Sequence, residues 1–219
     1  LSRADLTLFP PDHFDVVVVD EFHHAAAKSY QAILEHDYHT TSSAHHVTAA
    51  AREFLSDHVR TGDDRPFFLA VGFIRPHTPL HVPKRFFDMY PKDTLKLPVI
   101  KPGDADDTHY ADVFGPEIKG LKYFRLLQES YPSLDEGIKA FLQAYLASIA
   151  AVDECIGQVV DAVDRAGLAD NTIIVLWGDH GWQLGEHGMW NKHSCFETSM
   201  HTPLFISAPG IQGGTRPRA

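Results

Sequence analysis

Short apolar runs alternate with longer segments of helical periodicity along the chain. Four of these runs are predicted to be strands, and the first three of them to be buried, because they are rich in aliphatic and aromatic residues and are bounded by turn residues. They cover residues 14–20, 66–73, 171–177 and 203–207. Strands that alternate with helices are typical of an α/β fold, in which a mainly parallel sheet is flanked by helices on both faces.

Three segments have apolar residues at helical spacing. They are residues 25–35, 47–59 and 134–166. The third is the longest, and a Ser at position 133 with Glu three residues later forms a capping box at its start. Gly167 stands where a helix-terminating glycine is expected.

The remaining segments are polar or irregular. Residues 37–46 are predicted to be a linker, and residues 91–132 a long irregular excursion of the kind that often lines a functional cleft. Residues 74–81 and 178–193 each follow directly from the end of a predicted strand. Ligands of parallel sheets bind at the carboxyl ends of the strands, so these two loops are the predicted location of a site.

Composition excludes some classes of function. The 219 residues carry a formal net charge of −10 with the 15 histidines neutral, and an acidic chain repels nucleic-acid phosphates. The longest purely aliphatic run, residues 16–19, is far too short to span a membrane. We therefore expect neither a nucleic acid nor a membrane as partner. The chain starts at Leu1 without a signal peptide or an initiator methionine, so we expect the natural N-terminus to lie upstream.

The loop after the third predicted strand holds residue types suited to a charged ligand. Asp179 at a strand end is well placed to hold a divalent cation, and Lys192 could neutralise an oxyanion. The histidines and acids of the loop also allow a metal cluster of another kind. A simple turn, in which Asp179 caps the next helix, remains the alternative.

Residues 177–192 read Trp-Gly-Asp-His-Gly-Trp-x-Leu-Gly-Glu-His-Gly-x-Trp-x-Lys. This block closely resembles the C-terminal metal and sulfate loop of the sulfatase family, in particular the iduronate-2-sulfatase-like branch of the alkaline phosphatase superfamily. Three further blocks resemble the same family in the same order, at residues 66–79, 152–172 and 202–210. The resemblance covers about residues 47–219.

The resemblance implies a role for each matching residue. Asp179 and His180 would be ligands of one calcium ion, and Lys192 would contact the sulfate. His77 would also face the sulfate and could protonate the leaving oxygen as a general acid. Without the resemblance, His77 reads as a plain loop histidine. No direct role is expected for His187, which is predicted to be exposed or to form hydrogen bonds only.

The nucleophile of the family is not found in this sequence. Sulfatases use a formylglycine made from a Cys or Ser in a Cys-x-Pro-x-Arg motif, whereas Cys155 is followed by Ile-Gly-Gln and Cys195 by Phe-Glu-Thr. The resemblance therefore implies that the formylglycine, and the aspartate pair that completes the calcium shell, lie upstream. We expect this chain alone not to turn over sulfate esters.

The first 36 residues carry a different resemblance. Residues 14–24, which end in an Asp-Glu-x-His box at residues 20–23, resemble the magnesium-binding segment of a superfamily-2 helicase. No phosphate-binding Gly-x-x-x-x-Gly-Lys loop precedes them in the sequence. We therefore expect a helicase-like segment at 1–36, a junction at 37–46 that is either an assembly artefact or a degraded fusion, and the sulfatase-like part at 47–219.

Together these features predict part of a calcium-dependent sulfuric ester hydrolase that acts on a sulfated sugar or another small sulfate ester. Three alternatives remain open: a zinc-dependent phosphatase or phosphodiesterase of the same superfamily, a non-catalytic remnant that binds metal or sulfated glycan, and a helicase fragment. Metal content separates the first from a sulfatase, since zinc prefers nitrogen ligands and calcium prefers oxygen. The resemblance implies a periplasmic, secreted or lysosomal location.

Overall fold

The computed structural model describes residues 15–20, 42–106 and 109–214. The chain divides into two compact units. Unit 1 comprises residues 1–74, 152–177 and 203–219. Unit 2 comprises residues 75–151 and 178–202.

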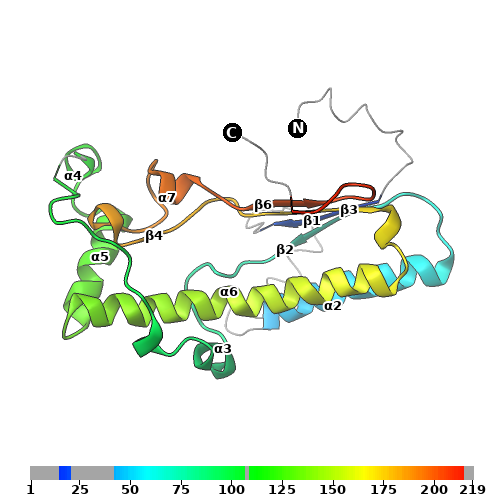
Figure 1. Ribbon diagram of the computed structural model, residues 1–219, viewed down its shortest axis with the longest axis horizontal. Helices are drawn as coiled ribbons and strands as arrows, with labels where there is room; N and C mark the ends of the chain where they lie inside the picture. Colours follow the sequence, from blue (N-terminus) through cyan, green and yellow to red (C-terminus); the bar gives the residue numbers. More distant parts are fainter. Residues whose placement is uncertain (1–14, 21–41, 107–108, 215–219) are drawn as a thin grey trace. The chain divides into compact units, whose positions relative to one another are not determined.

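Unit 1 is built on a four-stranded sheet in the order β2-β1-β3-β6 (Figure 1). The strands are β1 (Asp15–Asp20), β2 (Phe68–Gly72), β3 (Thr172–Trp177) and β6 (Leu204–Ser207). β1 is parallel to both β2 and β3, and only β6 is antiparallel to its neighbour. All four predicted strands are present, and the mainly parallel sheet confirms the predicted α/β class.

Helix α2 (Ser42–Thr61) and the C-terminal part of α6 (Leu134–Arg165) lie on the same face of this sheet (Figure 1). Their apolar residues form one core with those of the strands; its buried members are Ala51, Leu55, Val71, Phe73, Val152, Cys155, Val159 and Val163. α2 starts inside the predicted linker, because its first turn is polar and gives no apolar periodicity. The predicted helix at 25–35 and residues 37–41 of the predicted junction lie outside the described residues.

The ends of α6 are as expected. The helix was predicted for residues 134–166, and the backbone N–H of Glu136 donates to Ser133 Oγ at 3.3 Å, as a capping box requires. Gly167 has a φ of 70°, the left-handed conformation that terminates a helix. A short 3-10 helix, η3 (Ala169–Asn171), then leads into β3.

Unit 2 packs the first part of α6 against α5 (Lys119–Ser130) and a small antiparallel pair of strands, β4 (Gln183–Leu184) and β5 (Trp190–Asn191). Phe124, Leu127, Ile138 and Trp190 form its buried core. The other elements are short: α3 (Lys84–Asp88), η2 (Lys92–Thr94), α4 (Tyr110–Phe114), η4 (Glu186–Gly188) and α7 (Glu197–Met200).

The excursion, residues 91–132, is more ordered than the sequence predicted, because it contains both α4 and α5. α5 buries Phe124 and Leu127, but Tyr123 and Leu126 on the same helix are exposed. Apolar residues on more than one side of a helix blur its periodicity, which explains why the pattern did not reveal it.

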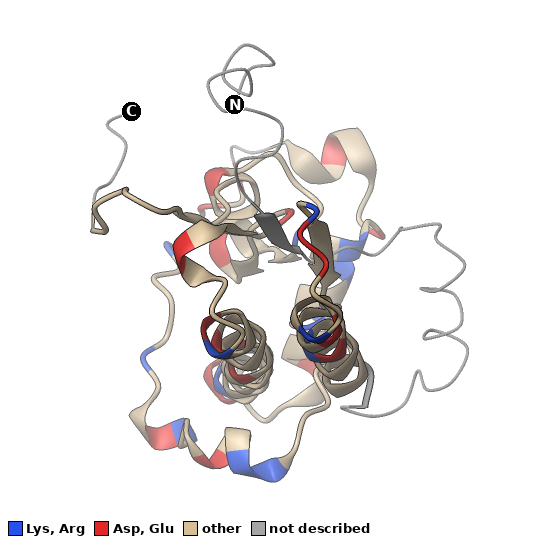
Figure 2. Ribbon diagram, turned by 90° about the vertical axis from the view of Figure 1, so that its right-hand side faces the viewer, with Lys and Arg blue, Asp and Glu red and all other residues tan. Residues whose placement is uncertain are grey.

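Charges of both signs are interspersed along α2 and α6 (Figure 2). Exposed ion pairs such as Arg60 with Asp57 and Arg165 with Asp161 join residues one turn apart. In the part of the chain that the structure describes, no helix combines the length and the apolar content needed to cross a bilayer.

Candidate functional site

Asp179 and His180 follow β3 directly, at the start of the loop that the sequence singled out. Asp179 Oδ1 lies 3.4 Å from His180 Nε2, and both side chains are only partly exposed. His180 Nδ1 lies 2.7 Å from the carbonyl oxygen of Gly181. A carbonyl oxygen only accepts, so Nδ1 carries the proton and Nε2 is the ring nitrogen directed at the carboxylate. This is the usual arrangement of a metal-binding histidine.

A glycine is required beside this pair. The Gly181 backbone N–H donates to Ser199 O at 2.7 Å, and a Cβ at position 181 would lie only 2.1 Å from Thr198 O. Thr202 Oγ1 donates to Gly178 O on the other side of the pair. Asp179 and His180 are thereby held between two backbone attachments.

Lys192 follows β5 and is anchored by a buried polar network. Gln183 Nε2, on the partner strand β4, donates to Ser194 Oγ at 2.6 Å and to Ser199 Oγ at 3.3 Å. The two serine oxygens are 2.8 Å apart. Gln183 is paired with Asn191, the residue before Lys192, and its side chain is hydrogen-bonded to Ser194, two residues after Lys192. The backbone is therefore held on both sides of Lys192.

His77 lies in the loop that follows β2. Its Nδ1 donates to the carbonyl oxygen of Thr78 at 2.6 Å, and its own carbonyl accepts from Arg75 Nη1 at 2.9 Å. Burial lowers the pKa of Arg75 below its ordinary value. The side chain and the backbone of His77 are thus both held in place.

Three of the four predicted residues, Asp179, His180 and Lys192, come from the loop after β3, and His77 comes from the loop after β2. Partial burial lowers the pKa of His193, and the charges of Lys119, Lys192, His180 and His77 lower it further. These basic residues all belong to unit 2, and the two lysines among them carry charges suited to an oxyanion.

Sequence reasoning missed His193 and Lys119. His193 adjoins Lys192, so its position next to a predicted ligand was an available signal. Lys119 is remote in sequence from the rest of the site and lies in the excursion, where no pattern distinguished it from other surface lysines.

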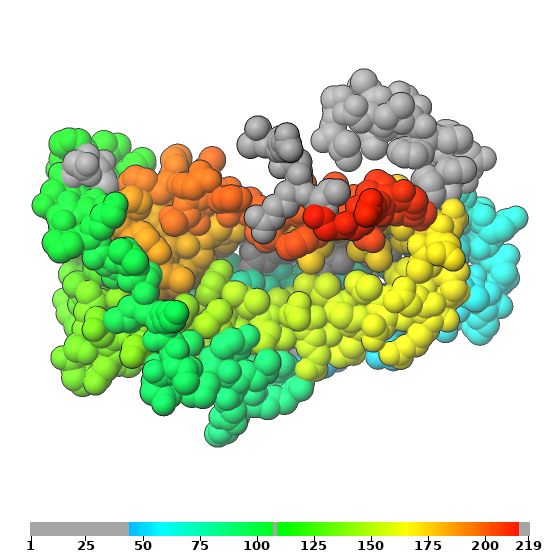
Figure 3. Space-filling model, in the orientation of Figure 1, coloured from blue at the N-terminus to red at the C-terminus, as the bar shows by residue number. Residues whose placement is uncertain are grey.

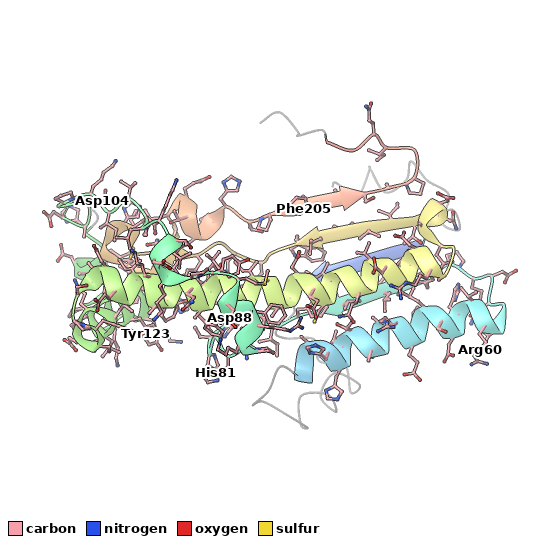
Figure 4. The ribbon with its side chains drawn as sticks, turned by 60° about the horizontal axis from the view of Figure 1, so that its bottom comes forward. Arg60, His81, Asp88, Asp104, Tyr123 and Phe205 are labelled. Carbon is pink, nitrogen blue, oxygen red and sulfur yellow. The ribbon has the colours of Figure 1, made fainter. Side chains whose placement is uncertain are left out.

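Hydrogen bonds from two residues of the excursion, Tyr110 and Asp104, join it to the loop 178–202, and the two segments lie side by side (Figure 3). The Tyr110 hydroxyl donates to the carbonyl oxygen of His193. Asp104, labelled in Figure 4, accepts from the backbone N–H of His187 at 3.1 Å and lies 3.1 Å from its Nδ1. The His187 ring also stacks on Phe196, with 3.9 Å between the ring centroids. His187 thus forms structural contacts, as the sequence suggested.

The donors of the Asp179–His180 pair, one carboxylate and one imidazole, suit a divalent cation. Calcium takes about six to eight oxygen ligands, so two side chains supply only part of a shell. Among residues 15–20, 42–106 and 109–214, no group of three or more His, Cys, Asp or Glu side chains is arranged to hold a metal ion. The pair therefore fits a divalent cation as two ligands of a larger set.

The family model described as Sulfatase matches residues 9–217 of the chain. A sulfatase from Formosa agariphila is 40% identical over 153 residues, which cover 69% of this chain and 29% of that protein. Iduronate 2-sulfatase from Mus musculus is 37% identical over 155 residues, covering 66% and 27% of the two chains. The chain thus spans less than a third of the length of these relatives. The matched residues include 9–46, the segment with the helicase-like resemblance and the predicted junction.

Solved structures agree in fold. A putative sulfatase from Bacteroides fragilis aligns with a TM-score of 0.52 and 27% identity, over 75% of this chain and 30% of that chain. A phosphonate monoester hydrolase from Silicibacter pomeroyi aligns with a TM-score of 0.63 and 26% identity, over 85% and 42%.

Proposed function

Because the chain belongs to the sulfatase family, we propose that the protein of which it forms part hydrolyses sulfate esters. The observation that carries the proposal is the Asp179–His180 pair at the end of β3, in which Asp179 Oδ1 lies 3.4 Å from His180 Nε2. The relatives are more than three times longer than the matched segment, so the formylglycine nucleophile is proposed to lie in a part of the protein upstream of Leu1.

Asp179 and His180 would hold one calcium ion together with carboxylates from that upstream part. The hydrogen bond from His180 Nδ1 to Gly181 O supports this role, because it directs Nε2 toward Asp179. When bound, the cation would polarise a sulfate oxygen and stabilise the charge that develops there.

Lys192 would act on the sulfate group, and His77 on the ester oxygen that leaves it. The Lys192 ammonium donates to a sulfate oxygen and offsets negative charge in the transition state. His77 donates its Nδ1 proton to Thr78 O, so a proton on Nε2 would be the one delivered to the leaving ester oxygen.

The proposed substrate is a small-molecule or saccharide sulfate ester. Iduronate 2-sulfatase and an N-acetylglucosamine-6-O-sulfatase, both named for sugars, are among the relatives of the chain. The acidic composition that disfavours nucleic acids does not oppose such a ligand, because the local charge around His193 is positive.

Isothermal titration of the 219-residue chain with inorganic sulfate, in the presence of calcium, tests the anion site. Lys192→Gln should weaken binding by about tenfold, the usual effect of losing one charged hydrogen bond. Lys122→Gln is the matched control, because Lys122 instead pairs with Glu117 at 3.9 Å. Unchanged binding after Lys192→Gln would remove Lys192 from the site.

A phosphatase or phosphodiesterase is the second candidate. It is favoured by the alignment with a phosphonate monoester hydrolase at a TM-score of 0.63. Metal analysis after dialysis against equal calcium and zinc separates the two candidates, since zinc prefers nitrogen ligands and calcium prefers oxygen. Zinc retained through Asp179 and His180 would favour the phosphatase, and calcium the sulfatase.

A further inference from the structure

Gln183, in the short strand β4, is buried with only 1% of its surface exposed. It occupies an open position of the block that resembles the sulfatase loop, so the resemblance assigns it no role. Burial of an amide is unfavourable unless the amide forms hydrogen bonds. The partners of the Gln183 side chain therefore indicate what it does.

On one side, Gln183 holds the segment that carries Lys192. It is paired with Asn191 across β4 and β5, and Asn191 directly precedes Lys192. Its Nε2 donates to Ser194 Oγ at 2.6 Å, two residues after Lys192. Lys192 thus lies between two points of attachment to Gln183.

On the other side, the same amide reaches the segment that carries His180. Gln183 Nε2 donates to Ser199 Oγ at 3.3 Å. The carbonyl oxygen of Ser199 accepts from the backbone N–H of Gly181 at 2.7 Å, and Gly181 directly follows His180. One buried side chain therefore connects the backbone beside the proposed cation ligands with the backbone beside the proposed sulfate ligand.

This connection matters for an anion that both halves of the site must contact. A sulfate held by Lys192 can also contact a cation at Asp179 and His180 only if the spacing between the two halves is right. A spacing that is fixed in advance raises the affinity for such a ligand, because less ordering is needed on binding.

We propose that Gln183 is a positioning residue, which sets the spacing between Lys192 and the Asp179–His180 pair. The inference rests on the proposed function and adds to it a residue that is not itself a ligand. Its measurable consequence is the calcium factor, defined as the ratio of the sulfate dissociation constants without and with calcium. This factor depends on Gln183.

The test measures both dissociation constants for inorganic sulfate and the 219-residue chain by isothermal titration. Gln183→Met keeps an unbranched side chain and removes the amide donor, while the hydroxyl oxygens of Ser194 and Ser199, 2.8 Å apart, still share a hydrogen bond. The calcium factor should fall about fivefold, the usual effect of losing one neutral hydrogen bond. The sulfate affinity without calcium should stay within about twofold of that of the wild type, because Lys192 itself is unchanged.

Gln143→Met is the matched control. Gln143 lies in α6, and its Nε2 also donates twice, to the carbonyl oxygens of Phe87 at 3.2 Å and Tyr90 at 2.9 Å. These bonds belong to unit 2 but lie outside the loop 178–202, so the calcium factor should not change. An equal fall in Gln143→Met and Gln183→Met would show general loosening of the unit and overturn the inference.

Further variants separate failure of the inference from failure of the proposed function. Ser194→Ala removes the 2.6 Å bond by a smaller change and should also lower the calcium factor; it decides alone if a thermal melt shows Gln183→Met to be unfolded. If both variants keep the full calcium factor while Lys192→Gln weakens sulfate binding, Gln183 is not a positioning residue and the sulfate site stands. If the wild-type chain binds no sulfate, or Lys192→Gln changes nothing, both are wrong.

Discussion

His77 and His180 are oriented by the same local hydrogen bond. In each, Nδ1 donates to the carbonyl oxygen of the following residue, at 2.6 and 2.7 Å. The bond fixes which ring nitrogen remains for chemistry, and the surroundings of Nε2 then set its role. Beside Asp179, the Nε2 of His180 is suited to ligate a cation. In His77, the same nitrogen is suited to carry a proton.

Asp179 provides the most direct test of the cation site. We expect calcium to raise the melting temperature of the 219-residue chain, because a ligand that binds only the folded state stabilises it, and Asp179→Ala should abolish this rise. Differential scanning calorimetry with and without calcium measures this. Asp153→Ala removes an exposed carboxylate from α6 and should leave the calcium shift intact. A full calcium shift in Asp179→Ala would exclude Asp179 as a ligand.

Within the loop 178–202, the segment at Gly181 lies close to the backbone of α7 and of His201. Gly181→Ala places a methyl group 2.1 Å from Thr198 O, so one of the two segments must move. We expect a loss of about 3 kcal/mol in the free energy of unfolding, at the upper end for an overpacked site. Urea denaturation measures this loss.

Gly157→Ala is the matched control for this substitution. Gly157 lies on an exposed part of α6, and no atom lies within 4 Å of the position that an alanine methyl group would take there. Alanine should therefore stabilise the helix by up to about 1 kcal/mol. Equal effects of the two substitutions would contradict the role assigned to Gly181.

The elements that sequence predicted are those whose signals are local. β3 and α6 have dense apolar patterns, and Ser133 and Gly167 mark the ends of α6. α5 was missed because exposed Tyr123 and Leu126 blur its buried face. A local signal cannot reveal packing between remote segments, and the position of Lys119 depends on such packing, at Gly120 against Trp190.

The site residues also divide into those marked by a local sequence signal and those positioned by contacts between remote segments. Asp179 and Lys192 were predicted as site residues because they lie in one distinctive loop, and His77 because its segment resembles a known family. The hydrogen bonds of Gln183, and those that join Tyr110 to His193, cross between segments that no spacing in the sequence relates. These contacts position the predicted site residues, but no sequence motif marks them.

At the scale of the whole molecule, the two units have separate cores, and all four predicted site residues belong to unit 2. Leu55 is fully buried in the core of unit 1. Leu55→Ala should lower the free energy of unfolding by about 2–5 kcal/mol. The affinity of the folded chain for sulfate should not change. Val59 is exposed on the same helix, so Val59→Ala should lower the free energy of unfolding by less than about 1 kcal/mol. Loss of sulfate affinity in folded Leu55→Ala would show that the site depends on unit 1.

The sheet of unit 1 also bears on the organisation of the chain. β1 lies between β2 and β3, and Val17 is paired with both Leu69 and Ile174. The segment with the helicase-like resemblance therefore contributes a central strand. Its assignment to a separate region, 1–36, remains a prediction.

The central claim is that one oxyanion site gathers His77, His180 and His193 around Lys192. The measurement that tests it most directly is an NMR titration of the 219-residue chain with inorganic sulfate, following the imidazole signals of all histidines. We expect the signals of these three residues to move together with one dissociation constant, while that of His58 in α2 stays in place. Movement of His58 with no change in His77, His180 and His193 would contradict the site.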